Sequence, residues 1–492
     1  MTKHYQQCTC GCNRREFVTG LLTAGAALGL RGMSASHAGT AAQEERKKQG
    51  AVVRAAFLYP PSKQFADNPD GWWSWPGNHF DAEGQQKRYM AAFQEMEKKL
   101  GMKIVADNEA IGTADGVQRF ISEIRSKRPD GVLLVMFYNG SLSHADAILK
   151  ATAEAKIPTV LFIGLAVHHG RVGQYRRPGV YFIQSLDNLA AIEYGMRMIA
   201  AKKAMTQTRL LSITEAKEPR EAVEPFFSIT VRVVPFPRYA EEFKKVTIDA
   251  EARRFIKQFT GGARENRGVT TEAFENTARA HFALKKLLAQ ENANGLAMNC
   301  LRRGMLKPCI SFATLNSELV PAACENDLPA LYTQLLGQLL TGRPGFQHNP
   351  CYETEGNHYF ASHCTCPTRL QGPDGQQQPY LLRKFAHSNE GSCAIQVFWT
   401  PGDPATMVKY YPGKEPTLDV YAAKVVRSHP IPPAAGCTTN VEIEIADRDD
   451  ACMVQGHHNV LFCGDFARKF RLFAQLYGLK LLDSGYKGPW PI

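Results

Sequence analysis

The chain has 492 residues and a formal net charge of +11 at pH 7. Basic residues are interspersed with acidic ones, and no basic stripe interleaved with aromatic residues occurs, which argues against a nucleic-acid-binding protein. The length corresponds to roughly two to four domains of ordinary size.

The N-terminal region has the features of a twin-arginine export signal. Arg14 and Arg15 precede a moderately apolar run, Gly20–Leu30, and a small-residue motif ends at Ala38. A membrane anchor is the alternative, but the run is much shorter than the ~20 residues that a membrane-spanning helix needs. We therefore predict that residues 1–38 are removed after export by the twin-arginine machinery. The mature chain is expected to have no membrane span and to be periplasmic or extracellular.

Residues 51–179, after a flexible leader at 39–50, are predicted to form an N-terminal α/β domain. Strands alternate with helices, which is typical of a doubly wound parallel sheet covered on both faces. No Gly-x-Gly-x-x-Gly motif follows the first strand, so a Rossmann cofactor site is not expected. The predicted elements are the strands Ala51–Leu58, Lys103–Ala106, Gly131–Phe137 and Pro158–Gly164 and the helices Ala82–Leu100, Val117–Ser126 and His144–Ala155.

A tryptophan-rich loop interrupts this domain. Three of the five tryptophans, including Trp72 and Trp73, lie in the turn-rich segment 68–78. Indole faces stack well on the C–H faces of sugars, and indoles flanked by Pro and Gly fit poorly into a core. We therefore predict that Trp72 and Trp73 contact a sugar; the alternative is that the loop only plugs its own domain.

Residues 180–345 are predicted to form a second doubly wound α/β domain. Its periodic segments again alternate between strand and helix. They are the helix Leu189–Lys202, the strand Arg209–Ile213, helical stretches at Ala240–Phe259 and Thr271–Glu291, and the strand Leu296–Cys300.

Glu325 lies just before the last helix of this domain. Asp327 is the expected N-cap, Pro329 fits the first turn, and Gly342 closes the C-terminus. A carboxylate at the positive end of a packed helix stays ionised. Glu325 is therefore a candidate metal ligand or base, and the alternative is that it only caps the helix.

Residues 346–492 are predicted to form a β-rich, barrel-like domain. Gly and Pro are frequent there, and short alternating runs occur at His358–Cys364, Cys393–Trp399 and Asn440–Ile445. Ten of the 13 cysteines lie between positions 300 and 463, and an oxidising compartment would allow disulfides among them. The Cys364-Thr365-Cys366 motif has no second pair at zinc-finger spacing, so structural zinc is not the favoured interpretation.

Two segments resemble the metal-binding stretches of the L-fucose isomerase family and its fucose-isomerase-like relatives. The first is Ala-Cys-Glu-Asn-Asp at 323–327, continuing through Leu339-Leu340-Thr341 to Phe346, and the second is His-Asn-Val-Leu-Phe-Cys-Gly-Asp at 458–465. The resemblance implies a divalent ion, Mn²⁺ for preference, bound by Glu325 and His458. A third family ligand, an Asp, falls on Asn349, which removes one negative charge and one acid/base group.

The same resemblance implies further features of the site. A His-Cys pair near the family site corresponds to His363-Cys364, so His363 is a candidate substrate contact. Family members form homo-oligomers in which the first domain of one subunit closes the site of another, so a homo-oligomer is expected here. In such an assembly the loop with Trp72 and Trp73 would cap a neighbour's pocket.

The chemistry explains why such residues would be needed. Aldose–ketose isomerisation moves a proton between C1 and C2 of a sugar; a divalent ion polarises the two oxygens, and a carboxylate carries the proton. Glu325 is thus predicted to be ligand and proton shuttle, His458 a ligand, and Asn349 a weak oxygen donor. Two alternatives stay open: a non-catalytic exported carbohydrate-binding protein, and a metal-assisted keto-sugar epimerase that uses Glu325 with His363.

Overall fold

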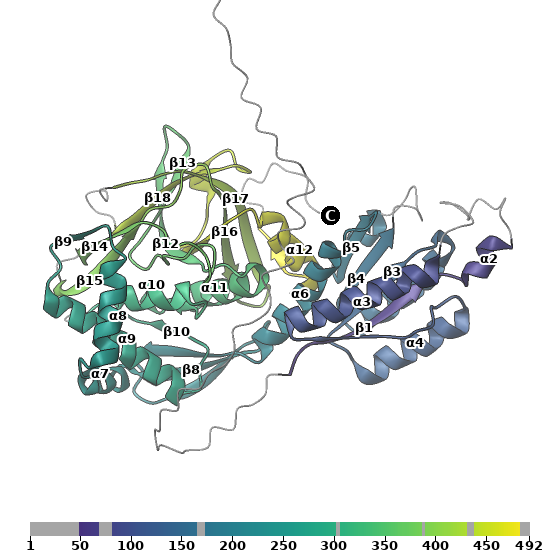
Figure 1. Ribbon diagram of the computed structural model, residues 1–492, viewed down its shortest axis with the longest axis horizontal. Helices are drawn as coiled ribbons and strands as arrows, with labels where there is room; N and C mark the ends of the chain where they lie inside the picture. The colour runs from purple at the N-terminus through teal and green to yellow at the C-terminus, as the bar shows by residue number, and fades with distance from the viewer. Residues whose placement is uncertain are drawn as a thin grey trace, which may run out of the picture. The chain divides into compact units, whose positions relative to one another are not determined.

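The computed structural model describes residues 49–67, 81–164, 173–301, 306–385, 389–430 and 437–482. These residues belong to one compact unit, and Figure 1 labels most of its helices and strands. The predicted export signal and the predicted sugar contacts Trp72 and Trp73 lie outside the described residues. Within the part of the chain that is described, no helix is both long and apolar enough to cross a bilayer.

The first sheet has five parallel strands in the order β2-β1-β3-β4-β5. Helices α3 and α6 pack on one face, and α4 and α5 pack on the other, so the predicted doubly wound sheet is confirmed. β5, at the start of the predicted second domain, pairs with β4 and extends this sheet. The elements are β1 (Val52–Leu58), α2 (Ser62–Ala66), α3 (Ala82–Leu100), β2 (Lys103–Ala106), α4 (Ala114–Lys127), β3 (Gly131–Met136), α5 (Leu142–Glu154), β4 (Thr159–Gly164), β5 (Val180–Ser185) and α6 (Leu189–Thr206).

The second sheet also has five strands, in the order β11-β10-β6-β8-β7. Only β7 runs antiparallel to its neighbour among these strands. Helices α7, α9 and α10 cover one face, while α6 and α11 cover the other, as a second doubly wound unit requires. The elements are β6 (Arg209–Thr214), β7 (Arg220–Glu224), β8 (Ile229–Pro235), α7 (Phe236–Lys245), α8 (Ala250–Gly261), α9 (Thr271–Gln290), β10 (Gly295–Met298), α10 (Cys309–Ser317), β11 (Ala322–Ala323) and α11 (Leu328–Thr341).

The predicted helical stretch 240–259 is two helices rather than one. α7 ends at Lys245, and α8 begins at Ala250, because Asp249 caps it by accepting a hydrogen bond from the Ala252 N–H. The intervening Val-Thr-Ile segment is β-branched, which lowers helix propensity. An N-cap signal inside an apolar periodic stretch therefore marks a new helix.

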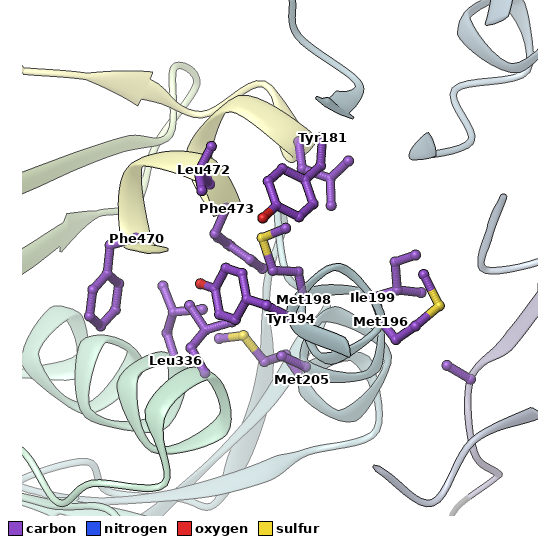
Figure 2. Close-up of a cluster of buried hydrophobic side chains, with 14 of the residues drawn as sticks. Tyr181, Tyr194, Met196, Met198, Ile199, Met205, Leu336, Phe470, Leu472 and Phe473 are labelled. Atoms are coloured by element: carbon purple, nitrogen blue, oxygen red, sulfur yellow. The ribbon is translucent and has the colours of Figure 1, made fainter. Parts of the chain in front are cut away.

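Helix α6 is buried on two sides, since it covers one face of each α/β sheet. Figure 2 shows Met196 and Ile199 on one side of the helix, whereas Tyr194 and Met198 point toward Phe473 of α12 (Ala467–Tyr477). The Tyr194 hydroxyl donates to the Lys469 carbonyl over 2.7 Å. A helix that is apolar on opposite sides is expected to be buried between layers.

Six antiparallel strands of the C-terminal region close into a barrel, which confirms the predicted β-rich, barrel-like region. Their order is β16-β19-β12-β13-β18-β17, and β17 pairs back to β16. One side of all six strands contributes to a common apolar cluster, which fills the barrel. The opposite side of β16 and β19 packs against α11, and that of β17 packs against α12. The strands are β12 (Phe346–Glu353), β13 (His358–His363), β16 (Pro404–Tyr411), β17 (Thr417–Ser428), β18 (Thr439–Ile445) and β19 (Asn459–Cys463), with β20 (Lys480–Leu481) added beside β17.

A small three-stranded sheet joins the second α/β unit to the C-terminal region. β14 (Tyr380–Phe385) and β15 (Asn389–Val397) form a hairpin, and β9 (Glu265–Arg267) pairs in parallel with β14. The Tyr380 hydroxyl donates to the Phe259 carbonyl at the end of α8 over 2.6 Å. These contacts tie segments more than a hundred positions apart in sequence.

Candidate functional site

Glu325 lies in the short turn Cys324–Asn326 that links β11 to α11. Glu325 and Asn326 both have left-handed backbone conformations, with φ of 58° and 53°. Such a conformation costs on the order of 1–3 kcal/mol for a non-glycine residue and persists only where the surroundings impose it. Here the Gln347 side chain bonds both the N–H and the carbonyl of Cys324, and the Ser212 hydroxyl donates to Asn326 Oδ1. The turn is thus held from two sides, as expected for a functional side chain.

Two buried imidazoles face the Glu325 carboxylate. His363 Nε2 lies 3.6 Å from Glu325 Oε1, and His458 Nε2 lies 3.5 Å from Glu325 Oε2. The two rings are 1% and 2% exposed, respectively. Neither Nε2 atom has a hydrogen-bond partner among the described residues. Burying an unpartnered imidazole nitrogen is unfavourable, so these two atoms point to a missing partner.

The spacing of these atoms suits a metal ion. An ion at the usual bond lengths of ~2.0–2.2 Å to nitrogen and oxygen separates tetrahedral ligand atoms by about 3.4 Å. Among the described residues, two groups of side chains have ligand atoms within 4.8 Å of one another and could hold an ion. One group is Cys324, Glu325 and His363, and the other is Glu325, His457 and His458. Glu325 belongs to both groups, which makes it the centre of the candidate site.

Asp327 orients His458, a role that the sequence analysis does not predict. One carboxylate oxygen caps α11, as predicted, by accepting from the Ala330 N–H. The other lies 2.9 Å from His458 Nδ1. A carboxylate bonded to Nδ1 fixes that proton on Nδ1 and leaves the Nε2 lone pair free to bind a metal. Because the N-cap pattern already accounts for an Asp at this position, the sequence carries no separate signal for this second bond.

Lys409 holds the same corner of the site. Its ammonium group donates to the carbonyls of His457 and His458 over 2.7 and 3.0 Å and lies 3.6 Å from Asp327 Oδ2. His458 itself has a left-handed backbone, with φ of 59°. Lys409 therefore holds in place the backbone that positions the His458 side chain.

The charges in the site favour an ionised carboxylate beside a neutral imidazole. The imidazoles of His363 and His458 hold the pKa of Glu325 well below its usual range, although burial acts in the opposite direction. Burial lowers the pKa of His363, and the Glu325 carboxylate offsets only part of that effect. Burial also acts to lower the pKa of His458, but Asp327 and Glu325 more than offset it, so this pKa is raised. Protons therefore compete with a metal ion mainly at His458.

Asn349, the residue at the position of the family's Asp, lines a pocket with Glu325 and His363. The pocket has a volume of about 70 Å³. Asn349 Oδ1 is buried and has no hydrogen-bond partner among the described residues. The structure thus brings Glu325, Asn349 and His363 to one pocket. His458 does not line this pocket, but its Nε2 lies 3.5 Å from the Glu325 carboxylate. Whether these residues bind a metal stays a prediction.

Two further histidines lie close to this site. The His457 side chain is 66% exposed, and its Nε2 lies 3.9 Å from Glu325 Oε2. His348 is fully buried, with Nδ1 3.0 Å from the Phe346 carbonyl and no partner for Nε2 among the described residues. Burial lowers the pKa of His348 to about 3. His348 is therefore a neutral residue of the barrel interior, whereas His457 is open to solvent.

Comparisons with known proteins add little to this description. No family model matches the sequence, and no curated protein matches it. Among the solved structures that match is the crystal structure of an ABC sugar transporter (periplasmic sugar binding protein) from Legionella pneumophila. It is 11% identical, and the match covers 58% of this chain and 94% of that chain with a TM-score of 0.18. A TM-score this low does not establish a shared fold, so no property of that protein is transferred to this chain.

Proposed function

We propose that the protein is a metal-dependent sugar isomerase that interconverts an aldose and a ketose. The observation that carries the proposal is the pair of buried, unpartnered Nε2 atoms that face one ionised carboxylate. In this proposal Glu325, His458 and His363 hold the ion, and Asn349 offers a neutral oxygen. His363 is predicted from the sequence as a substrate contact, but it lies as close to Glu325 as His458 does, so we assign it as a ligand.

The ion, when bound, would act as a Lewis acid on the two sugar oxygens at C1 and C2. Two imidazoles and one carboxylate form a donor set that suits transition-metal ions, with Mn²⁺ the ion expected from the resemblance. Glu325 supplies the only carboxylate among these four residues, so its negative charge is the main attraction for a cation.

The proton transfer needs a group that gains and loses a proton near neutral pH. The sequence predicts this role for Glu325, yet a carboxylate whose pKa is held well below its usual range is a weak base. His457 is largely exposed and lies beside Glu325, and its pKa is lowered because the side chain is partly buried and adjoins His458. We therefore assign His457 to carry the proton between C1 and C2 and Glu325 to hold the ion.

Metal content and hydrogen exchange in D₂O test the proposal directly. Purified protein loaded with Mn²⁺ is expected to retain about one ion per chain. With L-fucose or other aldoses, it is expected to exchange the C2 hydrogen for deuterium and to lose this activity in EDTA. Bound metal without exchange on any aldose would keep the metal site but contradict the isomerase activity. Absence of both metal and exchange would contradict the whole proposal.

Asn349→Asp should strengthen metal binding. The substitution adds a negative charge beside the Glu325 site and matches the carboxylate that the family resemblance places there. We expect the Mn²⁺ affinity to rise about tenfold, within the range that changes around metal sites produce. Isothermal titration with Mn²⁺ measures this, with Asn292→Asp, an exposed position, as the matched control. An unchanged affinity would show that Asn349 does not face the ion.

A further inference from the structure

The pocket beside Glu325 is unusually rich in sulfur. Its ten lining residues include five cysteines, which are Cys300, Cys309, Cys324, Cys364 and Cys437. Cys300 and Cys324 form a disulfide, while the other three are free thiols. The isomerase proposal uses none of these sulfur atoms, although thiolates are strong ligands for soft and borderline metal ions.

The disulfide is built into the turn that carries Glu325. Cys324 precedes Glu325 directly, and the Glu325 N–H donates a hydrogen bond to Cys300 Sγ over 3.4 Å. The two cysteines follow β10 and β11, which pair in parallel through Ala297 and Ala323. Both cysteines are almost fully buried. The bond therefore ties together the two strand ends from which the candidate metal site projects.

Cys324 Sγ is also placed as a ligand. It lies within 4.8 Å of both a Glu325 carboxylate oxygen and a His363 ring nitrogen. His363 Nε2 is a second, independent indication of a ligand here, because it is buried and has no hydrogen-bond partner among the described residues. In the disulfide, the Cys324 sulfur carries no charge that could bind an ion. As a thiolate it would complete a set of sulfur, carboxylate and imidazole donors.

We propose that Cys324 becomes a metal ligand when the Cys300–Cys324 disulfide is reduced, so that the redox state of this pair selects the ion that the site binds. A dithiol reductant delivers two electrons and two protons to the disulfide, which becomes two thiols while the reductant becomes a disulfide. The Cys324 thiol loses its proton to solvent as it binds the ion. The oxidised site, with oxygen and nitrogen donors, suits Mn²⁺, whereas the reduced site adds sulfur and suits Zn²⁺ or Co²⁺.

This inference rests on the metal site of the proposed function but not on its isomerase activity. Its test therefore uses metal ions alone. Co²⁺ is a convenient probe, because a thiolate bound to Co²⁺ gives a near-ultraviolet charge-transfer band that oxygen and nitrogen ligands do not give. Zn²⁺ affinity is measured beside it by competition with a chromophoric chelator.

Wild type in both redox states and three variants of the full chain separate the possible ligands. Reduced wild type and Cys300→Ser without reductant both carry a free Cys324, so both are expected to show the Co²⁺ band and to bind Zn²⁺ at least about tenfold more tightly than oxidised wild type. Cys324→Ser is expected to show no band in either redox state. Cys364→Ser, which removes a pocket thiol 3.3 Å from Cys309 Sγ, is the control and is expected to keep the band on reduction.

The outcomes distinguish this inference from the proposed function. A band that persists in Cys324→Ser, or a Zn²⁺ affinity that is equal in both redox states, would overturn the role of Cys324 and leave the Glu325 site intact. Absence of metal binding in every form would overturn both. Cys300→Ser and Cys324→Ser lose the same disulfide, so equal melting temperatures for the two variants would show that a difference between them is not a folding effect.

Discussion

Replacing Glu325 with Gln is expected to abolish metal binding while the protein stays folded. Gln keeps the size of the side chain but removes the charge that faces His363 and His458. Loss of an outer partner of a metal ligand typically reduces affinity by roughly 10- to 100-fold, and loss of a charged ligand is expected to cost more. Metal analysis after dialysis, together with C2 hydrogen exchange, should therefore show neither bound ion nor activity above background.

Thermal unfolding with and without Mn²⁺ gives a second measure of the same change. An ion that binds only the folded state raises its stability by about 2.7 kcal/mol at one hundred times its dissociation constant. Wild type should thus melt at a higher temperature when Mn²⁺ is added, whereas Glu325→Gln should not respond. Glu444→Gln, at an exposed position on β18, is the matched control and should behave as wild type. A Glu325→Gln variant that keeps the Mn²⁺ response would remove this residue from the site.

The parts of the fold that the sequence predicts are those set by local patterns. The helix at 328–341 begins and ends where Asp327 and Gly342 place it, since the cap residues act on their own helix. Helix α3 and strand β2 likewise match the predicted bounds. Closure of the barrel depends instead on the pairing of β16 with β17 and β19, which no local pattern specifies. The pairing of Glu265 with Leu381 is equally non-local.

In the candidate site, too, some features follow from local sequence and others only from the folded chain. Glu325 can be singled out from its place before a capped helix, and His458 and Asn349 follow from the family resemblance. The Cys300–Cys324 disulfide cannot be predicted, because spacing alone does not decide which of ten cysteines pair. The contact of His363 with Glu325 needs strand β13 to end beside the turn after β11. This proximity is a property of the folded chain that neither segment carries by itself.

Replacing Asp327 with Asn should weaken metal binding by about 10- to 100-fold through its effect on His458. Asn is as good an N-cap as Asp, so the start of α11 is expected to survive. The amide cannot replace the carboxylate that holds the Nδ1 proton and the ring orientation of His458. Titration with Mn²⁺ at pH 8 measures the loss.

The pH dependence of binding separates this positioning role from a purely structural one. Burial acts to lower the pKa of His458, but Asp327 and Glu325 raise it above its usual value, so protons compete with the ion at His458. Without the Asp327 charge the pKa of His458 falls, so the pH below which the Mn²⁺ affinity starts to decline should move to lower pH, even though the affinity at pH 8 is weaker. Asp249→Asn changes the N-cap of α8 in the same way without touching the site. It should alter neither the pH dependence of Mn²⁺ binding nor the affinity at pH 8. If both variants keep the wild-type pH dependence and affinity, Asp327 serves only the helix. A shift confined to Asp327→Asn shows that its carboxylate acts on the site, through His458 or through Lys409, which it also faces.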